Sequence, residues 1–267
     1  MSTARMAWWR WVLATFVILS LWVYGSALIT LALRPLPTTA PWQQLLHDLA
    51  TFIPFIIATP LVWRFATHLP IARLVNVRGR IAGGRIVMGA AAWFALSAIA
   101  TMIDWRLHPG AYRTTFVAST FVPFALVTLV LLPVQSWAEE LFFRGWILRW
   151  ASSLQAPAQV VLSGVVFALP HLGNPEASRQ TLLAFGSWFL LGAGWAYVSV
   201  RDGGIELAMG AHLANNAFSL LIVGYDGAVL PTSAIFTTSS LDLGVTFASL
   251  ACVVPLFALI TRRARPQ

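Results

Sequence analysis

The segment TTFVASTFVPFALVTLVLLPVQSWA, residues 114–138, contains no charged residue over 25 positions. As an α-helix it would extend roughly 37 Å, at ~1.5 Å per residue, which exceeds the ~30 Å hydrocarbon layer of a bilayer. The segment therefore predicts a transmembrane helix. Directly after it comes EELFFRGW, residues 139–146, which places two carboxylates and an arginine at the end of that helix.

Seven further runs between charged residues are apolar in the same way. Most are about 18 residues or longer, and the short run 49–63 becomes long enough if Asp48 lies at the interface and Arg64 extends outward. Segments of about ten residues with alternating polarity, which a β-barrel would need, are not visible. We therefore predict an all-α, polytopic transmembrane bundle of about eight spans that encloses a polar cavity. The eight runs are 11–33, 49–63, 86–103, 114–138, 150–175, 180–200, 207–225 and 243–261.

Composition supports the same class. The 267 residues are 58% hydrophobic and 10% charged, whereas soluble domains carry roughly 25% charged residues. The first run is too long for the apolar region of a signal peptide, so we interpret it as a retained helix. We find no repeat and no soluble segment, and we expect a single membrane domain over residues 1–267. Close helix packing is predicted at Gly192/Ala196 and Gly210/Ala214, because small residues at this spacing let helices approach.

All seventeen basic residues are arginine, and their distribution predicts the orientation. Cytoplasmic loops are enriched in Arg and Lys, so the more basic side should be cytoplasmic, with both termini there. We expect a multi-pass protein of a cell membrane, most simply a bacterial inner membrane, that contacts anionic headgroups and not nucleic acid. The basic side carries Arg5, Arg10, Arg73, Arg78, Arg80, Arg85, Arg144, Arg149, Arg201, Arg262, Arg263 and Arg265. The other side carries Arg34, Arg106, Arg113 and Arg179.

A few ionisable residues lie too deep to be interfacial. Such groups cost roughly 2.5–3.5 kcal/mol each to insert and mark candidate functional sites. They are Glu139, Glu140, His171 and His212, and Glu206 stands at the start of a span. The remaining histidines, His47, His68 and His108, and the five aspartates lie at run edges or in loops. Cys252 is the only cysteine, so no disulfide framework and no cysteine-based metal site is expected.

Local spacing divides the two glutamates. Glu140 and Arg144 stand at i and i+4 with the acid first, the better orientation for an ion pair. Glu139 has apolar neighbours ahead and no local countercharge, which suits a general base. We therefore interpret Glu139 as the working residue and Glu140 with Arg144 as its support. The alternative is an ion-pair cluster at a helix end with no catalytic role.

The second half of the chain supplies the possible partners. His212 and Asn216 lie at i and i+4 among small residues, and an imidazole beside a carboxamide can donate to a developing oxyanion. Interhelical hydrogen bonding is the other explanation for this pair, at about 0.6 kcal/mol per contact. His171 follows Pro170 at the end of its span, where a histidine is often just interfacial.

Together these three segments resemble the CPBP family of intramembrane proteases, also called the Abi or CAAX-protease family. The matching motifs are Glu139-Glu140-x-x-x-Arg144, Phe167-x-x-x-His171 and His212-x-x-x-Asn216, in the same order and spacing. The match covers roughly residues 136–220, within a motif-bearing core of approximately 114–225. The resemblance implies peptide-bond hydrolysis in a helical bundle.

By position, the resemblance also implies residue roles. Glu139 and His171 would activate a water, His212 and Asn216 would stabilise the oxyanion, and Glu140 and Arg144 would be structural. A divalent metal such as zinc, held by Glu139, His171 and His212, stays open as an alternative to unaided activation of water.

The substrate is expected to be a membrane protein or peptide, without further definition. Two other functions stay open at this point. One is a proton-coupled transporter, because buried Glu and His chains also form proton relays. The other is a non-catalytic immunity or scaffold protein.

Overall fold

The computed structural model describes residues 6–238 and 241–262, so Arg5, Arg263 and Arg265 of the predicted basic side lie outside the described residues. Within these ranges, six helical stretches are long and apolar enough to cross a membrane. The chain is therefore a multi-pass membrane protein. The six are α1 (Trp8–Leu33), α2 with α3 (Pro41–Ala50 and Ile53–Thr67), α5 (Gly83–Leu107), α6 with its extension (Ala118–Ser153), α10 (Thr181–Asp202) and α12 (Leu243–Ile260).

The two remaining apolar runs are also helical but shorter. They form α8 (Ala156–His171), and α11 (Glu206–Ala217) with the π-helical segment η4 (Phe218–Ile222). Each of the eight predicted runs thus corresponds to a helical segment, and the all-α prediction is confirmed.

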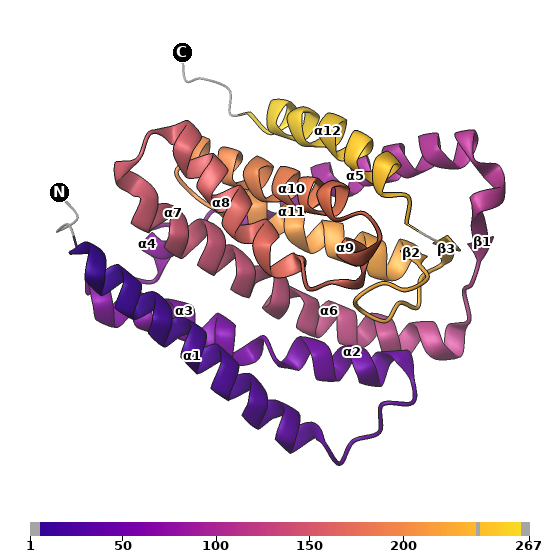
Figure 1. The fold of residues 1–267 in the computed structure, drawn as a ribbon, viewed down its shortest axis with the longest axis horizontal. Helices are drawn as coiled ribbons and strands as arrows, with labels where there is room; N and C mark the ends of the chain where they lie inside the picture. Colours follow the sequence, from indigo (N-terminus) through magenta and orange to yellow (C-terminus); the bar gives the residue numbers. More distant parts are fainter. Residues whose placement is uncertain (1–5, 239–240, 263–267) are drawn as a thin grey trace.

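Short elements connect these helices. A small sheet has the strand order β1-β3-β2, with β1 antiparallel and β2 parallel to β3. It joins the segment after α5 to the segment after η4 at one end of the bundle (Figure 1). The short elements are α4 (Ala72–Val75), η1 (Pro109–Ala111), α9 (Pro175–Arg179), β1 (Tyr112–Thr114), β2 (Val223–Tyr225) and β3 (Phe236–Thr238).

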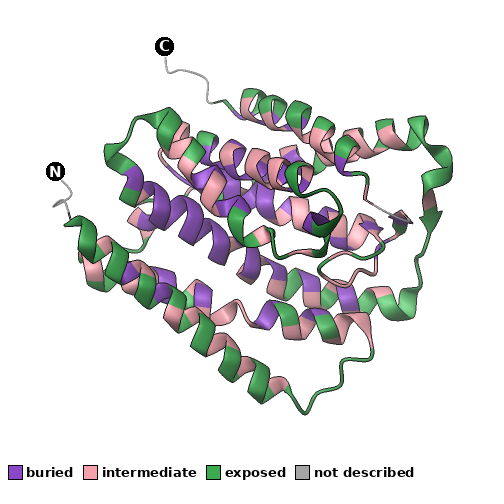
Figure 2. Ribbon diagram, in the orientation of Figure 1, coloured by how far each residue is buried: buried purple, intermediate pink, exposed green. Residues whose placement is uncertain are grey.

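Two of the three motif-bearing helices, α6 and α11, lie in the interior together with α10. In Figure 1, α6, α10 and α11 occupy the middle, with α1 to α3 along one side and α5 and α12 along the other. Burial follows this arrangement: half of the apolar window of α10 is buried, against 6% for α1 and 11% for α5. Figure 2 shows the buried segments concentrated in the centre. The outer helices expose apolar side chains, as lipid contact requires.

Glycine allows α11 to lie directly on α5. A Cβ atom added at Gly210 would lie 2.0 Å from the carbonyl oxygen of Ile86, and one at Gly89 would lie 2.3 Å from that of Leu207. Neither position accepts a larger residue unless the two helices move apart. The close packing predicted at Gly210 is confirmed, and it brings the α11 motif against the rest of the core.

The end of α6 departs from regular α-helix. After α6 (Ala118–Glu140), the chain makes a π-helical turn, η2 (Leu141–Trp146), before α7 (Ile147–Trp150) and the 3-10 turn η3 (Ala151–Ser153). All six residues of η2 are buried. Single π-helical turns occur frequently at functional sites, and this one immediately follows the glutamate pair.

Candidate active site

Glu140 and Arg144 form a fully buried ion pair. Arg144 Nη1 donates to Glu140 Oε1 at 2.6 Å, and neither side chain is exposed. A second guanidinium nitrogen lies 3.3 Å from the carbonyl oxygen of Gly192. The guanidinium carbon also lies 4.2 Å from the centre of the Phe167 ring, within cation–π range. The predicted i, i+4 pair is confirmed, and it connects η2 to α8 and α10.

Glu139 is held by only one of its oxygens. Gln135 Nε2, one helical turn earlier on α6, donates to Glu139 Oε1 at 2.7 Å. Glu139 Oε2 is buried and accepts no hydrogen bond from any residue that the structure describes. It lies 3.7 Å from His212 Nε2, which is beyond hydrogen-bond range. Glu139 therefore presents one unoccupied acceptor to an imidazole nitrogen.

His212 connects the two glutamates. Its Nδ1 lies 2.8 Å from Glu140 Oε1, and because a carboxylate only accepts, this nitrogen carries the proton. The opposite nitrogen, Nε2, then points to Glu139. The ring stacks on Trp195, with centroids 4.7 Å apart and an interplanar angle of 25°. Both the position and the tautomer of His212 are thus fixed by α6 and α10.

Asn216 reaches the same cluster through Gln135. Its Nδ2 donates to Gln135 Oε1 at 3.2 Å, and its own Oδ1 accepts from Asn215 Nδ2 at 3.0 Å. A carboxamide nitrogen has two hydrogens, so one N–H of Asn216 is left after the bond to Gln135. The structure therefore brings Glu139, Glu140, His212 and Asn216 together, from helices more than sixty residues apart in the sequence.

His171 lies at the edge of this cluster. It is partly exposed at the end of α8, where its Nδ1 lies 2.8 Å from the carbonyl oxygen of Phe167 and must donate to it. Its ring contacts those of Phe167 and Trp188. The Phe167 ring also contacts His212, at 5.9 Å between centroids. Among the described residues, no hydrogen bond or ion pair joins His171 to Glu139.

The donors do not form a metal site in this arrangement. Nowhere in residues 6–238 and 241–262 do three His, Cys, Asp or Glu side chains group closely enough to hold a metal ion. Glu140 Oε1 is already bonded to Arg144 and His212, and Glu140 Oε2 accepts no hydrogen bond from the described residues. The set Glu139, His171 and His212 is therefore not assembled as three metal ligands.

Several residues of the cluster were not identified from the sequence. Gln135 stands four positions before Glu139 on the same helix, a spacing that could have indicated contact. Asn215 is adjacent to a motif residue and binds Trp93 Nε1 through its Oδ1 at 3.2 Å. No sequence signal connects Trp93, on α5, to the motifs.

One buried acid outside the cluster, Glu176, was also not identified from the sequence. Glu176 lies on α9 and is 3% exposed. Its Oε1 accepts hydrogen bonds from the backbone N–H of Val229, at 3.3 Å, and from the hydroxyl of Tyr225. Burial, together with this hydrogen bond, raises the pKa of Tyr225 well above its usual value. The contact ties α9, which follows His171, to the segment after η4.

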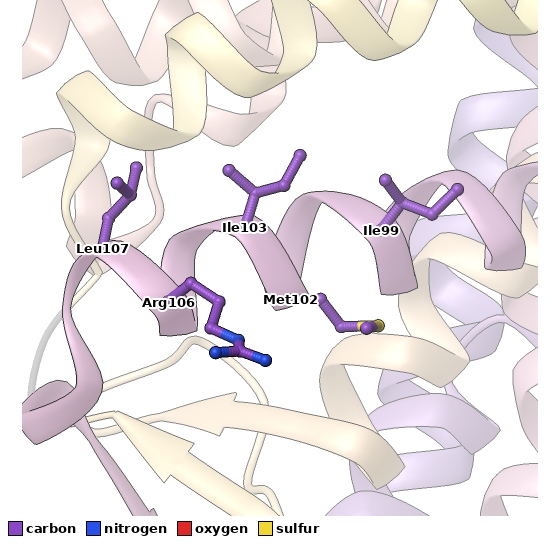
Figure 3. A pocket seen from close by; sticks show the side chains of 5 residues that line it. All are labelled: Ile99, Met102, Ile103, Arg106 and Leu107. Carbon is purple, nitrogen blue, oxygen red and sulfur yellow. The ribbon is translucent and has the colours of Figure 1, made fainter.

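A hollow on the outer surface lies apart from these residues. It encloses about 340 Å³ beside the second half of α5, and none of the motif residues lines it (Figure 3). Four of its five lining side chains are apolar, as expected for a lipid-facing helix. Its lining is Ile99, Met102, Ile103, Arg106 and Leu107.

Comparison with known proteins tests whether the chain belongs to the family that its three motifs resemble. A family model described as type II CAAX prenyl endopeptidase Rce1-like matches residues 118–218, which include all three motifs. The uncharacterized protein YyaK of Bacillus subtilis (strain 168) is 31% identical over 232 residues, which cover 80% of this chain and 78% of YyaK. The chain belongs to the Rce1-like CAAX protease family. No solved structure matches it.

Membership in the Rce1-like CAAX protease family confirms the resemblance that the three motifs indicated. Together with the membrane-crossing helices, it supports an intramembrane protease. The match begins at the first residue of α6 and ends at the start of η4. The matched range thus includes α6, α10 and α11, the helices that occupy the middle of the bundle.

Proposed function

We propose that this protein is an intramembrane endopeptidase in which the Glu139 carboxylate activates a water for attack on a peptide bond. One observation carries the proposal: Glu139 Oε2 is buried, has no hydrogen-bond partner among the described residues, and faces His212 Nε2 at 3.7 Å. Leaving a buried acceptor unsatisfied costs free energy. The Oε2 atoms of Glu140 and Glu176 are also buried without a hydrogen-bond partner among the described residues, but Glu140 is held at Oε1 by both Arg144 and His212. Glu139 has a single donor and its free oxygen faces an imidazole nitrogen, which supports it as the group that meets water and substrate.

The reaction follows from these positions. Glu139 Oε2 takes a proton from a water as the water oxygen forms a bond to the carbonyl carbon of the scissile peptide. The resulting tetrahedral oxyanion then re-forms its C=O bond, the C–N bond breaks, and the leaving amine takes the proton from Glu139. General-base assistance of this kind contributes roughly 10²–10⁴-fold in rate.

Asn216 and His212 would stabilise the oxyanion. The Asn216 N–H that is not bonded to Gln135 can donate to it. The Nδ1–H of His212 donates to Glu140 Oε1. His212 can therefore donate to the oxyanion from Nε2 only as the imidazolium, with both nitrogens protonated. Loss of one such donor costs roughly 2.7–4 kcal/mol in other hydrolases.

The remaining motif residues would position the reacting groups. The Glu140–Arg144 ion pair would support His212 from the opposite side of its ring, because Glu140 Oε1 binds Nδ1 whereas Nε2 faces Glu139. By its place in the motif, His171 assists in orienting the water. Its Nδ1 is committed to the carbonyl oxygen of Phe167, which leaves Nε2 as an acceptor.

We further propose that residues approximately 114–225 form the protease core of a single membrane domain, with both termini in the cytoplasm of a bacterial cell. The substrate would be a membrane protein or peptide whose cleavage site enters the bundle. The basic loop, through Arg73, Arg78 and Arg80, would then contact anionic headgroups on the cytoplasmic face. Arg85, at the end of this loop, instead pairs with Asp202.

Cleavage by the reconstituted protein tests the proposal. Wild type and Glu139→Gln are reconstituted in liposomes with a library of membrane peptides, and new termini are identified by mass spectrometry. Wild type should produce defined termini, and Glu139→Gln should lower the rate about 10²–10⁴-fold. Glu206→Gln is the matched control, because it removes a buried carboxylate on α11 that lies outside the cluster.

Two results would contradict the proposal. Equal cleavage by wild type and Glu139→Gln would remove Glu139 from the mechanism. No cleavage by wild type, accompanied by a proton flux that Glu139→Gln abolishes, would favour transport. Elemental analysis after chelator treatment tests the metal-free chemistry: activity should persist, and a loss that zinc reverses would show that the working arrangement differs from this one.

A further inference from the structure

A one-way series of hydrogen bonds ends at the Glu139 carboxylate. Trp93 Nε1 donates to Asn215 Oδ1 at 3.2 Å, and Asn215 Nδ2 donates to Asn216 Oδ1 at 3.0 Å. Asn216 Nδ2 then donates to Gln135 Oε1 at 3.2 Å, and Gln135 Nε2 donates to Glu139 Oε1 at 2.7 Å. The series runs from α5 across α11 to α6. We call it the donor chain.

The chemistry of its two ends fixes the direction of the donor chain. An indole N–H can only donate and an ionised carboxylate can only accept, so each amide between them must point its oxygen toward Trp93 and its nitrogen toward Glu139. Ser136 Oγ also donates to Gln135 Oε1, at 3.1 Å. Reversing the Gln135 amide would place N–H against N–H at Asn216 and oxygen against the carboxylate.

The donor chain is held rigidly at its start. Trp93 is 1% exposed, and its ring packs edge-on against Trp195 and Phe257, with centroids 5.4 and 5.1 Å away. Gln135 is 7% exposed and Ser136 is fully buried. Asn215 and Asn216 between them are partly exposed. Water is therefore excluded mainly at the two ends of the donor chain, where a low-dielectric interior strengthens a hydrogen bond.

Gln135 is the member of the donor chain that contacts both the proposed base, Glu139, and the proposed oxyanion donor, Asn216. It binds the oxygen of Glu139 that does not face His212, which leaves Oε2 as the basic atom. It also occupies one N–H of Asn216, which leaves the other for the oxyanion. A change at Gln135 would therefore move the base and the oxyanion donor relative to each other.

We propose that Gln135 is a positioning residue that holds Glu139 and Asn216 in a single catalytic geometry, and that Asn215 and Trp93 set the direction of its amide. This inference rests on the proposed function. Neither Asn215 nor Trp93 belongs to the three motifs, and both act only through the residues that they bind.

Two nearly isosteric substitutions break the donor chain without changing side-chain size. Gln135→Glu keeps an acceptor for Asn216 and replaces the N–H₂ that binds Glu139 with an oxygen. Asn215→Asp keeps the acceptor for Trp93 and replaces the N–H₂ that binds Asn216. Gln135→Glu should lower kcat about tenfold to a hundredfold, the range expected for one hydrogen bond to a charged group. Asn215→Asp removes a bond between two neutral amides and should lower kcat about twofold to tenfold. KM should stay at the wild-type value, because neither residue contacts substrate.

Combining the substitutions separates positioning from general damage. Because the bonds are in series, Gln135→Glu with Asn215→Asp should lower kcat little more than the stronger single variant. Gln159→Glu is the matched control: it makes the same chemical change at a partly exposed glutamine of α8 whose Nε2 binds the carbonyl oxygen of Leu154. Gln159→Glu should keep the wild-type kcat.

Folding is monitored by thermal unfolding of each variant in detergent. If Gln135→Glu does not fold, Gln135→Met, which is similar in size and has no polar group, gives the same test. Folded variants with the wild-type kcat, or losses that multiply in the double variant, overturn the positioning role alone. A wild type that cleaves no peptide overturns the proposed function instead, so the two failures are distinct.

Discussion

Two buried glutamates, Glu139 and Glu206, differ in what surrounds them. Glu206 begins α11 and is 2% exposed, and its Oε1 accepts from Asn76 Nδ2 at 2.7 Å and from the backbone N–H of Ala82 at 3.0 Å. Glu139, at 8% exposure, accepts one hydrogen bond at Oε1 and none at Oε2 from the described residues. Burial alone therefore does not distinguish a supporting acid from a candidate catalytic one.

The number and origin of the donors make the distinction. Two donors from the segment before α5 fix Glu206, so its carboxylate attaches that segment to the first turn of α11, where a negative charge is also favourable. Glu139 receives its one donor from its own helix and faces another motif residue. Substitutions in each cluster can test whether the first region serves stability and the second serves the reaction.

The largest effect on stability is expected at the buried Glu140–Arg144 ion pair. Glu140→Ala or Arg144→Ala should lower the free energy of unfolding by about 3–5 kcal/mol, because each leaves an uncompensated buried charge. Glu140→Leu combined with Arg144→Met should cost less than either single change. Denaturant unfolding in micelles measures this, with the exposed Arg64→Ala as control. A loss for the pair equal to the sum of the single losses would contradict the ion-pair account.

Glu206 should show the opposite combination of effects. Glu206→Ala leaves two donors without their acceptor and should lower the free energy of unfolding by about 1–3 kcal/mol. The cleavage rate per folded molecule should stay at the wild-type level, and Glu206→Gln, which keeps an acceptor oxygen, should be milder. Unfolding curves and cleavage assays on the same samples give both values. A reduced rate in fully folded Glu206→Ala would place this glutamate in the reaction.

Gly210 lies between the two clusters on α11 and tests whether they share one rigid helix. Gly210→Ala would force α11 away from Ile86 of α5 and should lower the free energy of unfolding by about 1–3 kcal/mol. Because Trp93 lies on α5, the cleavage rate should fall as well. Gly84→Ala is the control, since a Cβ there meets nothing within 4 Å. Equal effects of the two substitutions would contradict the close approach.

The smallest effect is expected at Tyr225, outside both clusters. Its pKa is raised in the folded protein, so its proton is held more tightly there than in the unfolded chain. The stabilisation is complete below the usual pKa of 10.0 and is lost as the pH rises above it. Tyr225→Phe should cost about 0.5–1.5 kcal/mol at pH 8, and the difference in Tm from wild type should shrink above pH 10. A constant difference would show that the tyrosine hydroxyl does not titrate with folding.

Much of the candidate site could be predicted because its signals are local. The Glu140–Arg144 pair follows from helical spacing, and His212 and Asn216 share a face for the same reason. The π-helical turn at residues 141–146 was not predicted, because no composition rule distinguishes it from regular helix. Glu206 was placed only at a span entrance, since its partners are more than a hundred residues away.

By itself, the sequence determined the class of the protein and the identity of its chemical groups. Long uncharged runs must be helical in lipid, since every backbone polar group there needs an internal partner. The tertiary structure decided that Glu139 Oε2 is left without a donor among the described residues, which imidazole nitrogen faces it, and that Gln135, Asn215 and Trp93 join the cluster. Such contacts depend on how helices distant in sequence pack and rotate against one another, and the spacing of residues along one helix carries no information about that.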